Sequence, residues 1–278
     1  MSEVSLTGKP EAVAVRRFSS TELDKMRASF ERDGYFVIPG LIPREMLVNL
    51  NRDLSTAFTA MEKEGALFAG GGRLSGHLNC FPGQQSRFLY EILSEAGIID
   101  LIKQIDPKVV RMPNIGCNYN LPGSTTQHYH TDYDFSRGFM IANVAVVDTT
   151  IANGAMEAAP GTHTKYYPYW RFALERAARN SLRVEMKQGD VMVRTSSMWH
   201  RGMPNMTKVA RPMLAMTWED GGSQLPDPFL KDGGAIKFYP NWFKPTTAGR
   251  IRERTTVAAP LIYSSYRFVS SLFGNKGA

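Results

Sequence analysis

The stretch TTQHYHTDYDF, residues 125–135, gathers two histidines and two aspartates within seven residues. In a strand, successive side chains point to opposite faces, so His130 and Asp132 would share one face while Thr131 points away. His128 has the same parity and competes with His130. An imidazole and a carboxylate two residues apart can chelate one cation. The competing interpretation is a solvated turn whose aspartate caps a neighbour.

This pair needs a third ligand before it specifies a metal centre. With five histidines and 26 acidic residues in 278, roughly 0.5 pairs of the type His-x-Asp or His-x-Glu arise by chance. Two imidazoles and one carboxylate on one face of an octahedral ion leave positions open, which is typical of non-haem Fe(II). The candidate third ligands are His77, His128, His163 and His200.

The segment GDVMVRTSSMWHRGMPN, residues 189–205, favours His200 as that ligand. His200 ends a predicted strand, and after a turn the chain returns through Arg211 into another strand. We expect this hairpin to bring Arg211 alongside His200. A guanidinium buried in a barrel needs an anion, and a carboxylate matches its forked geometry. 2-Oxoglutarate, which can chelate iron at one end and pair with Arg211 at the other, meets both demands.

Helices come first along the chain and short strands follow. The expected elements are helices at 19–33, 44–63, 94–105 and 169–181 and strands at 35–38, 109–120, 139–150, 182–186, 190–195 and 211–218. This order predicts a helical flank packed on an antiparallel barrel or sandwich. Because no repeat or linker is found, residues 1–278 are expected to form a single domain, with a loose arm at 1–18 and a C-terminal extension at 221–278.

Composition narrows the class of protein. The hydrophobic content of 43% and the charged content of 21% are those of a globular chain. Two cysteines, Cys80 and Cys117, are too few for a disulfide framework and favour a reducing compartment. No apolar run reaches the roughly 20 residues that cross a bilayer, and the N-terminus lacks a signal-peptide core. A cytoplasmic location is therefore expected.

The net charge of +7 is scattered along the chain. This distribution argues against nucleic acid as a partner and fits a small acidic substrate or cosubstrate. The glycine-rich stretch 65–79 lacks the strand and helix that flank a phosphate-binding loop, so it is expected to be a flexible loop near the site.

Several segments, in order, resemble the phytanoyl-CoA hydroxylase-like family of Fe(II)/2-oxoglutarate dioxygenases. They are FERDGYFVIPGLIPREML (30–47), LPGSTTQHYHTD (121–132), NGAMEAAPGTH (153–163) and GDVMVRTSSMWHRGMPN (189–205), followed by Arg211. The resemblance covers about residues 25–220 and implies a mainly β fold, a double-stranded β-helix (jelly-roll, cupin-like) core with flanking helices. It implies Fe(II), 2-oxoglutarate as cosubstrate and O2. His130, Asp132 and His200 would be the iron ligands, and Arg211 would bind the distal carboxylate of 2-oxoglutarate.

The resemblance also implies roles for residues near these ligands. Gln127 matches a position that reaches the cosubstrate in several relatives, and Asn118 and Asn120 on the preceding strand are further candidates to line its pocket. Relatives that halogenate usually lose the carboxylate that Asp132 retains, so halogenation is disfavoured. The candidate substrate contacts are Phe135, Tyr133, Met156, Arg201 and His77. Their alternatives are a packed aromatic for Phe135, a rim charge for Arg201 and a surface histidine for His77.

The remaining notable side chains have structural interpretations. His128 is expected on a strand face or behind the ligands, and His163 in a hydrogen-bonding structural role. Trp199 and Trp218 are expected in the core. In PLIYSSYRFVSSLFG, residues 260–274, the residues Ile262, Tyr266, Val269 and Phe273 recur at helical spacing. This face is expected to pack into the core or to form the seam of a homodimer.

The sequence therefore predicts an Fe(II)- and 2-oxoglutarate-dependent oxygenase of a small-molecule metabolite, placed in secondary metabolism by its divergent C-terminus. It would hydroxylate, desaturate or cyclise an aliphatic C–H position and release succinate and CO2. No nucleic-acid or membrane partner is expected. The alternatives are a non-catalytic metal- or ligand-binding barrel and an oxygenase of nucleic acid or protein side chains.

Overall fold

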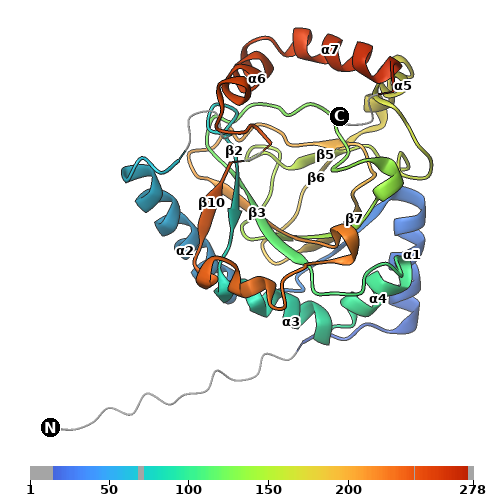
Figure 1. The fold of residues 1–278 in the computed structure, drawn as a ribbon. Coiled ribbons are helices and arrows are strands. Elements are labelled where there is room, and N and C mark those ends of the chain that lie inside the picture. Colours follow the sequence, from blue (N-terminus) through green and yellow to red (C-terminus); the bar gives the residue numbers. More distant parts are fainter. Residues whose placement is uncertain (1–14, 68–71, 241, 275–278) are drawn as a thin grey trace, which may run out of the picture.

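The computed structural model describes residues 15–67, 72–240 and 242–274, with strands in the middle and helices on two opposite sides (Figure 1). The larger sheet has the order β1 (Tyr35–Ile38), β7 (Val191–Thr195), β4 (Met140–Ala145), β9 (Arg211–Thr217), β3 (Asn114–Asn120), β2 (His77–Phe81) and β10 (Lys237–Tyr239). The smaller sheet has the order β6 (Leu182–Val184), β5 (Met156–Ala158) and β8 (His200–Arg201). The strand pairs are antiparallel. The fold is the expected double-stranded β-helix with flanking helices.

One group of helices packs on the larger sheet. These are α1 (Ser20–Asp33), α2 (Arg44–Lys63), α3 (Arg87–Glu95) and α4 (Ile98–Ile105). The predicted capping box opens α1, because the Ser19 side chain accepts from the Glu22 backbone and the Glu22 carboxylate accepts from the Ser19 backbone. A single helix was expected at 94–105, but α3 ends before Gly97, whose φ of 79° is left-handed and starts a new helix.

Alternation along the strands of the larger sheet separates the core from a central cavity. Ala142 on β4 and Leu214 on β9 pack into the main apolar cluster with α1–α4. Their neighbours Asn143 and Met213 point the other way and line the cavity, as does Arg194 on β7. Burial of one strand face against the helices therefore fixes which side chains face the cavity.

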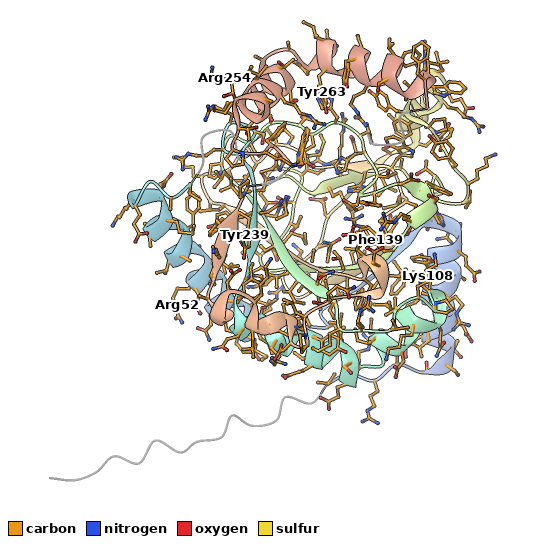
Figure 2. All side chains as sticks on the ribbon, in the orientation of Figure 1. Arg52, Lys108, Phe139, Tyr239, Arg254 and Tyr263 are labelled. Carbon is orange, nitrogen blue, oxygen red and sulfur yellow. The ribbon has the colours of Figure 1, made fainter. Side chains whose placement is uncertain are left out.

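A second group of helices, α5 (Tyr169–Leu174), α6 (Thr247–Ala258) and α7 (Pro260–Leu272), covers the opposite side (Figure 1). The carboxylate of Glu253 on α6, fully buried, accepts from the backbone of Leu74 at 2.9 Å and of Ser75 at 3.0 Å. Figure 2 shows Tyr263 on the inner side of this group and Arg254 on its outer side. The C-terminal extension is thus tied to the turn that leads into β2.

The face of α7 that was expected to pack into the core is exposed. Its inner face is formed by Tyr263, Arg267 and Ser271, whereas the predicted residues Ile262, Tyr266, Val269 and Phe273 are 51–86% exposed. The prediction that this face packs into the core is wrong, because the buried face of α7 carries a tyrosine, an arginine and a serine. The homodimer seam stays a prediction.

The segment that carries His130 and Asp132 is extended but does not belong to a sheet. Residues 125–135 form no strand of either sheet, and only His130 makes an isolated bridge, to His200. Of the predicted arm 1–18, residues 1–14 lie outside the described residues, as do residues 68–71 of the glycine-rich stretch. Among the helices of the described segments, none has the length and apolar character to cross a membrane.

Candidate active site

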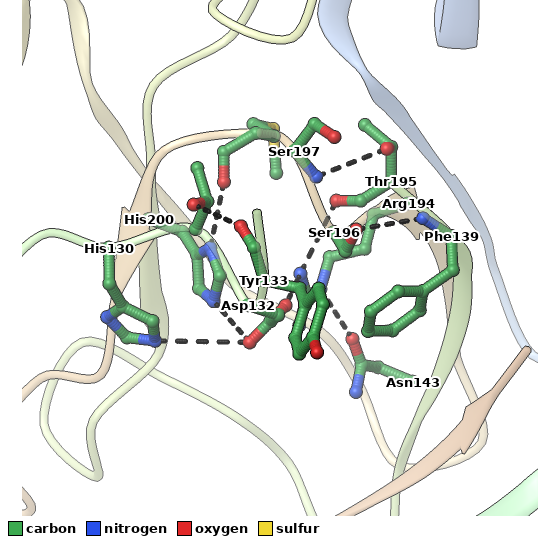
Figure 3. Close-up of polar contacts among 12 residues, drawn as sticks. His130, Asp132, Tyr133, Phe139, Asn143, Arg194, Thr195, Ser196, Ser197 and His200 are labelled. Atoms are coloured by element: carbon green, nitrogen blue, oxygen red, sulfur yellow. Dashed lines mark hydrogen bonds and ion pairs between the residues drawn. The ribbon is translucent and has the colours of Figure 1, made fainter. Parts of the chain in front are cut away.

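Three side chains from two distant segments meet on the wall of the central cavity. His130, Asp132 and His200 each offer one ligand atom, and these atoms lie within 4.8 Å of one another. Asp132 Oδ1 is 4.0 Å from His130 Nε2 and 3.5 Å from His200 Nε2 (Figure 3). Two imidazole nitrogens and one carboxylate oxygen at this spacing fit a single Fe(II) ion with coordination positions left open.

Backbone carbonyls orient both imidazoles. His130 Nδ1 lies 2.8 Å from the His128 carbonyl oxygen, and His200 Nδ1 lies 2.9 Å from that of Met198. In both rings Nδ1–H donates to the carbonyl, which leaves the Nε2 lone pair for a metal. Burial, with the neighbouring His200, lowers the pKa of His130 to about 3. The ring is therefore neutral at physiological pH, as a metal ligand must be.

The second oxygen of the carboxylate is held by an arginine that sequence reasoning missed. Arg194 on β7 donates from Nη1 to Asp132 Oδ2 at 2.6 Å and from Nε to Asn143 Oδ1 at 2.9 Å (Figure 3). Burial acts to raise the pKa of Asp132, but Arg194 and then His200 hold it well below its usual range. Asp132 is thus an anion with Oδ1 turned toward the imidazoles. The only signal in the sequence was an arginine in the apolar strand DVMVRT.

Backbone hydrogen bonds bring the two ligand-bearing segments together. His130 and His200 exchange N–H···O bonds of 2.9 and 3.0 Å, and the Asp132 amide donates to the Ser196 carbonyl at 3.0 Å. His200 is anchored in turn by its register opposite Ala158 on β5. His130 and Asp132 therefore point to the same side, as predicted, although the segment that carries them is not a regular strand.

Arg211, on β9, lines the same cavity and is 5% exposed. Its Nη2 donates to the Gly154 carbonyl at 3.1 Å, while its Nε has no hydrogen-bond partner and no carboxylate pairs with it among the described residues. Burial lowers its pKa to about 10, so it stays charged at neutral pH. The donor group left over fits one carboxylate of 2-oxoglutarate.

The predicted hairpin between His200 and Arg211 is wrong. β8 belongs to the smaller sheet and β9 to the larger one, where Arg211 stands opposite Asn120 of β3. The segment between them therefore crosses from one sheet to the other, and the two residues face one cavity from different walls.

Of the three other residues predicted to contact the cosubstrate, two line the cavity and one does not. Gln127 and Asn118 line the cavity, and Gln127 Oε1 accepts from the Gly202 amide at 2.8 Å. Asn120 is fully buried and does not line the cavity, and its Nδ2 donates to the Met203 carbonyl at 3.1 Å. Asn120 thus supports the chain that leads from β8 to β9.

The cavity has a volume of about 930 Å³, which is in the range of small-molecule sites. Its apolar lining includes Ile141, Met156, Val184, Met186, Met192 and Met213. Methionine side chains are flexible and polarisable, so this wall can adapt to an apolar ligand body.

Of the five predicted substrate contacts, Met156 alone lines this cavity. Phe135 borders an adjoining cavity of about 70 Å³, with its ring 6.0 Å from that of Tyr166. Tyr133 is 39% exposed and lies under the Arg137 guanidinium. The positions of Phe135 and Tyr133 place them outside the main chamber.

Two further candidates serve other contacts. Arg201 pairs with Glu157 at 2.5 Å and lies over the Tyr129 ring, so its charge is already matched. His77 is 2% exposed on β2, with Nε2 2.7 Å from the Thr125 carbonyl oxygen. The expectation of a surface histidine is wrong, because residues 77–81 form a buried strand instead of the end of a loop.

The side chains that were expected to have structural roles pack against aromatic rings or in the core. The His128 ring lies 4.5 Å from the Tyr263 ring, and His163 lies 6.0 Å from Phe30 beneath the end of α1. Trp199 and Trp218 are both buried. The sequence did not predict that the C-terminal extension lines the cavity, where it contributes among others Arg252, Tyr263 and Arg267.

Comparison with known proteins identifies the class. The sequence profile of the phytanoyl-CoA dioxygenase (PhyH) family matches residues 30–213. The dioxygenase FUM3 of Gibberella moniliformis is 23% identical over 228 residues, which are 72% of each chain. The structure resembles AviO1 from Streptomyces viridochromogenes (17% identity, 75% of this chain and 99% of that one, TM-score 0.56). It also resembles the epimerase SnoN in complex with Fe3+, alpha ketoglutarate and nogalamycin RO (17%, 72% and 84%, 0.54).

The fold and the two-histidine, one-carboxylate cluster define an Fe(II)- and 2-oxoglutarate-dependent oxygenase, which also uses O2. The chain belongs to the phytanoyl-CoA dioxygenase family. The matched region ends at residue 213, so α6 and α7 lie beyond it.

Proposed function

We propose that this oxygenase hydroxylates, desaturates or cyclises an aliphatic C–H position of a small-molecule metabolite, with release of succinate and CO2. The observation that carries the proposal is one cavity that holds both the three-ligand cluster and the buried, carboxylate-free Arg211. Iron and 2-oxoglutarate, when bound, supply the oxidising chemistry of the reaction.

The proposal gives each side chain a defined task. His130, Asp132 and His200 hold the iron, and Arg211 pairs with the distal carboxylate of 2-oxoglutarate. Gln127 and Asn118 are proposed to contact the cosubstrate. Ligand orientation comes from the carbonyl–imidazole bonds and from the Arg194 contact to Asp132.

Two features support a small molecule that is oxidised instead of halogenated. The volume of about 930 Å³ suits a compact ligand, and Asp132 keeps the carboxylate that occupies the coordination position a halide would need. Two proteins of similar fold are associated with small molecules. SnoN comes from nogalamycin biosynthesis, and EctD from S. alaskensis has been solved with 2-oxoglutarate and 5-hydroxyectoine (17% identity, 79% of this chain and 85% of that one, TM-score 0.54).

Anaerobic addition of Fe(II) and 2-oxoglutarate to the metal-free protein tests the assignment. We expect the visible charge-transfer band of the chelate, its loss in His130→Ala, Asp132→Ala and His200→Ala, and much weaker 2-oxoglutarate binding in Arg211→Ala. His128→Ala is the matched control, because His128 neighbours the cluster and packs on Tyr263. Loss of iron binding in His128→Ala with retention in His130→Ala would contradict the ligand assignment.

Two assays separate the alternative functions. Succinate release in the presence of O2 excludes a non-catalytic barrel. A salt-sensitive gel shift with DNA or RNA would instead favour an oxygenase of nucleic acid, because phosphate contacts weaken as salt rises.

A further inference from the structure

Arg267, on α7, brings a positive charge from the C-terminal extension to the edge of the metal cluster. Its Nη1 donates to the Tyr129 carbonyl at 2.7 Å, and Tyr129 directly precedes His130. The residue is 6% exposed and lines both the central cavity and the smaller one beside it. A side chain at this junction is placed to contact a ligand that approaches the metal cluster.

The guanidinium of Arg267 has donors to spare. Its Nε and Nη2 are buried without hydrogen-bond partners, and it pairs with no carboxylate in the described ranges. Its other contact is the Tyr169 ring, 4.3 Å away, and burial lowers the pKa of the group. The hydrogen bond that anchors α7 to Tyr129 uses only one of the three guanidinium nitrogens, Nη1. A buried charge with two unused donor nitrogens is costly unless an anion joins it.

The charge of the cavity lining points the same way. Five arginine and lysine side chains line it, Arg194, Arg211, Lys231, Arg252 and Arg267, against the carboxylates of Asp132 and Glu219. Arg194 is matched by Asp132, and Arg211 is assigned to 2-oxoglutarate. The three remaining cations, Lys231, Arg252 and Arg267, all come from the extension, so the lining still favours an anion after the cosubstrate is bound.

Arg252, on α6, is an exposed side chain on the cavity wall near Arg267. It donates to the Tyr263 hydroxyl at 2.9 Å and lies 4.6 Å from the centre of the Trp242 ring. No ion pair joins it to a carboxylate in the described part of the chain. Its exposure places it at the opening, while Arg267 lies deeper.

We propose that the substrate is an amphipathic organic anion whose carboxylate, phosphate or sulfate group binds Arg267, with Arg252 as a second cation at the opening. The apolar body of the substrate then lies along the methionine-rich wall toward His130. This assignment rests on the proposed function, because it places the substrate in the same chamber as iron and 2-oxoglutarate. α6 and α7 thereby set substrate class from outside the family-matched region.

Calorimetric titration of the full chain, loaded anaerobically with Fe(II) and 2-oxoglutarate, tests the proposal. The ligands are straight-chain carboxylates from hexanoate to dodecanoate and the corresponding alkyl phosphates and sulfates, each paired with its neutral amide or alcohol. We expect at least one anion to bind roughly tenfold or more tightly than its neutral partner. Equal binding of every pair, including no binding by the whole series, would overturn the proposal.

Variants show whether Arg267 is the cause of the anion preference. Arg267→Gln should reduce the preference to about twofold or less while 2-oxoglutarate affinity holds, and Arg267→Lys should keep part of it. Arg254→Gln, on the outer side of α6, is the matched control. An equal loss of anion and neutral ligand in Arg267→Gln would instead indicate a merely structural arginine.

A second variant and the iron-free protein keep the test decisive. If Arg267→Gln does not fold, Arg252→Gln replaces it, since that side chain is exposed; an unchanged preference there overturns the proposal. If the wild-type chelate band does not form, the proposed function fails. The same titration of the iron-free protein then still measures the anion preference.

Discussion

Arg194 Nη1 lies 2.6 Å from Asp132 Oδ2, and this contact leaves Oδ1 as the oxygen that faces the two imidazoles. The arginine side chain is 8% exposed, so its charge is little screened by water. Asn143 accepts from its Nε and fixes the guanidinium from the next strand. The geometry of the metal cluster therefore depends on a residue that is not itself a ligand.

Replacement of Arg194 by methionine should weaken Fe(II) binding by roughly 10- to 100-fold, as expected for a group that orients a metal ligand. The Asp132 carboxylate loses its fixed rotamer and the charge that keeps it ionised. Competition with a coloured Fe(II) chelator measures the affinity, and Arg194→Lys should be intermediate. Arg137→Met is the control, because Arg137 pairs with Asp220 on the exposed surface. Equal Fe(II) affinity in Arg194→Met and wild type would refute this role.

Arg211 should discriminate between keto acids by their distal group. 2-Oxobutyrate can chelate iron but lacks the second carboxylate, so wild-type protein should prefer 2-oxoglutarate by roughly a hundredfold, as for a buried charge pair. Arg211→Met should bind the two acids with nearly equal affinity. Chelate-band titrations give both constants. A preference that survives in Arg211→Met would mean that another cation, such as Arg267, receives the distal carboxylate.

Prediction from the sequence succeeded for those site residues whose chemistry leaves few alternatives. Residue chemistry narrowed the candidate ligands to histidines and carboxylates, and the resemblance to the dioxygenase family then pointed to His130, Asp132 and His200. Arg211 was predicted correctly as a buried arginine on the cavity, although by a hairpin that does not exist. Two sheets that close on each other bring distant residues together in a way that local turn patterns do not show.

The sequence did not predict contacts made by long-range packing. Arg194 looked like any charged residue of a strand, because its partner Asp132 is 62 residues away. For α7, apolar spacing selected the exposed face, while the buried face carries Arg267 and Tyr263. A polar residue buried for function breaks the apolar pattern on which such predictions depend.

His77 should make the metal-free protein less stable in acid. Burial lowers its pKa from 6.5 to about 4, so between these values the unfolded chain binds a proton that the folded chain excludes. Its contribution is complete above pH 6.5 and is lost as pH falls toward 4, by about 3 kcal/mol over the window. Chemical denaturation at several pH values should show a flatter pH profile for His77→Gln than for wild type. Parallel profiles would contradict the prediction.

Glu253 should control the attachment of α6 and α7 to the turn that precedes β2. In Glu253→Ala the backbone amides of Leu74 and Ser75 lose their carboxylate acceptor. The amide of Ser75, a buried residue, is then left unsatisfied at a cost of about 1–3 kcal/mol. We expect a lower unfolding midpoint and faster proteolysis within residues 242–274. Arg254→Ala, next in sequence but exposed, should leave both unchanged. If Glu253→Ala digests at the wild-type rate, the apolar contacts of Phe243 and Tyr263, both buried, hold the extension in place without the carboxylate.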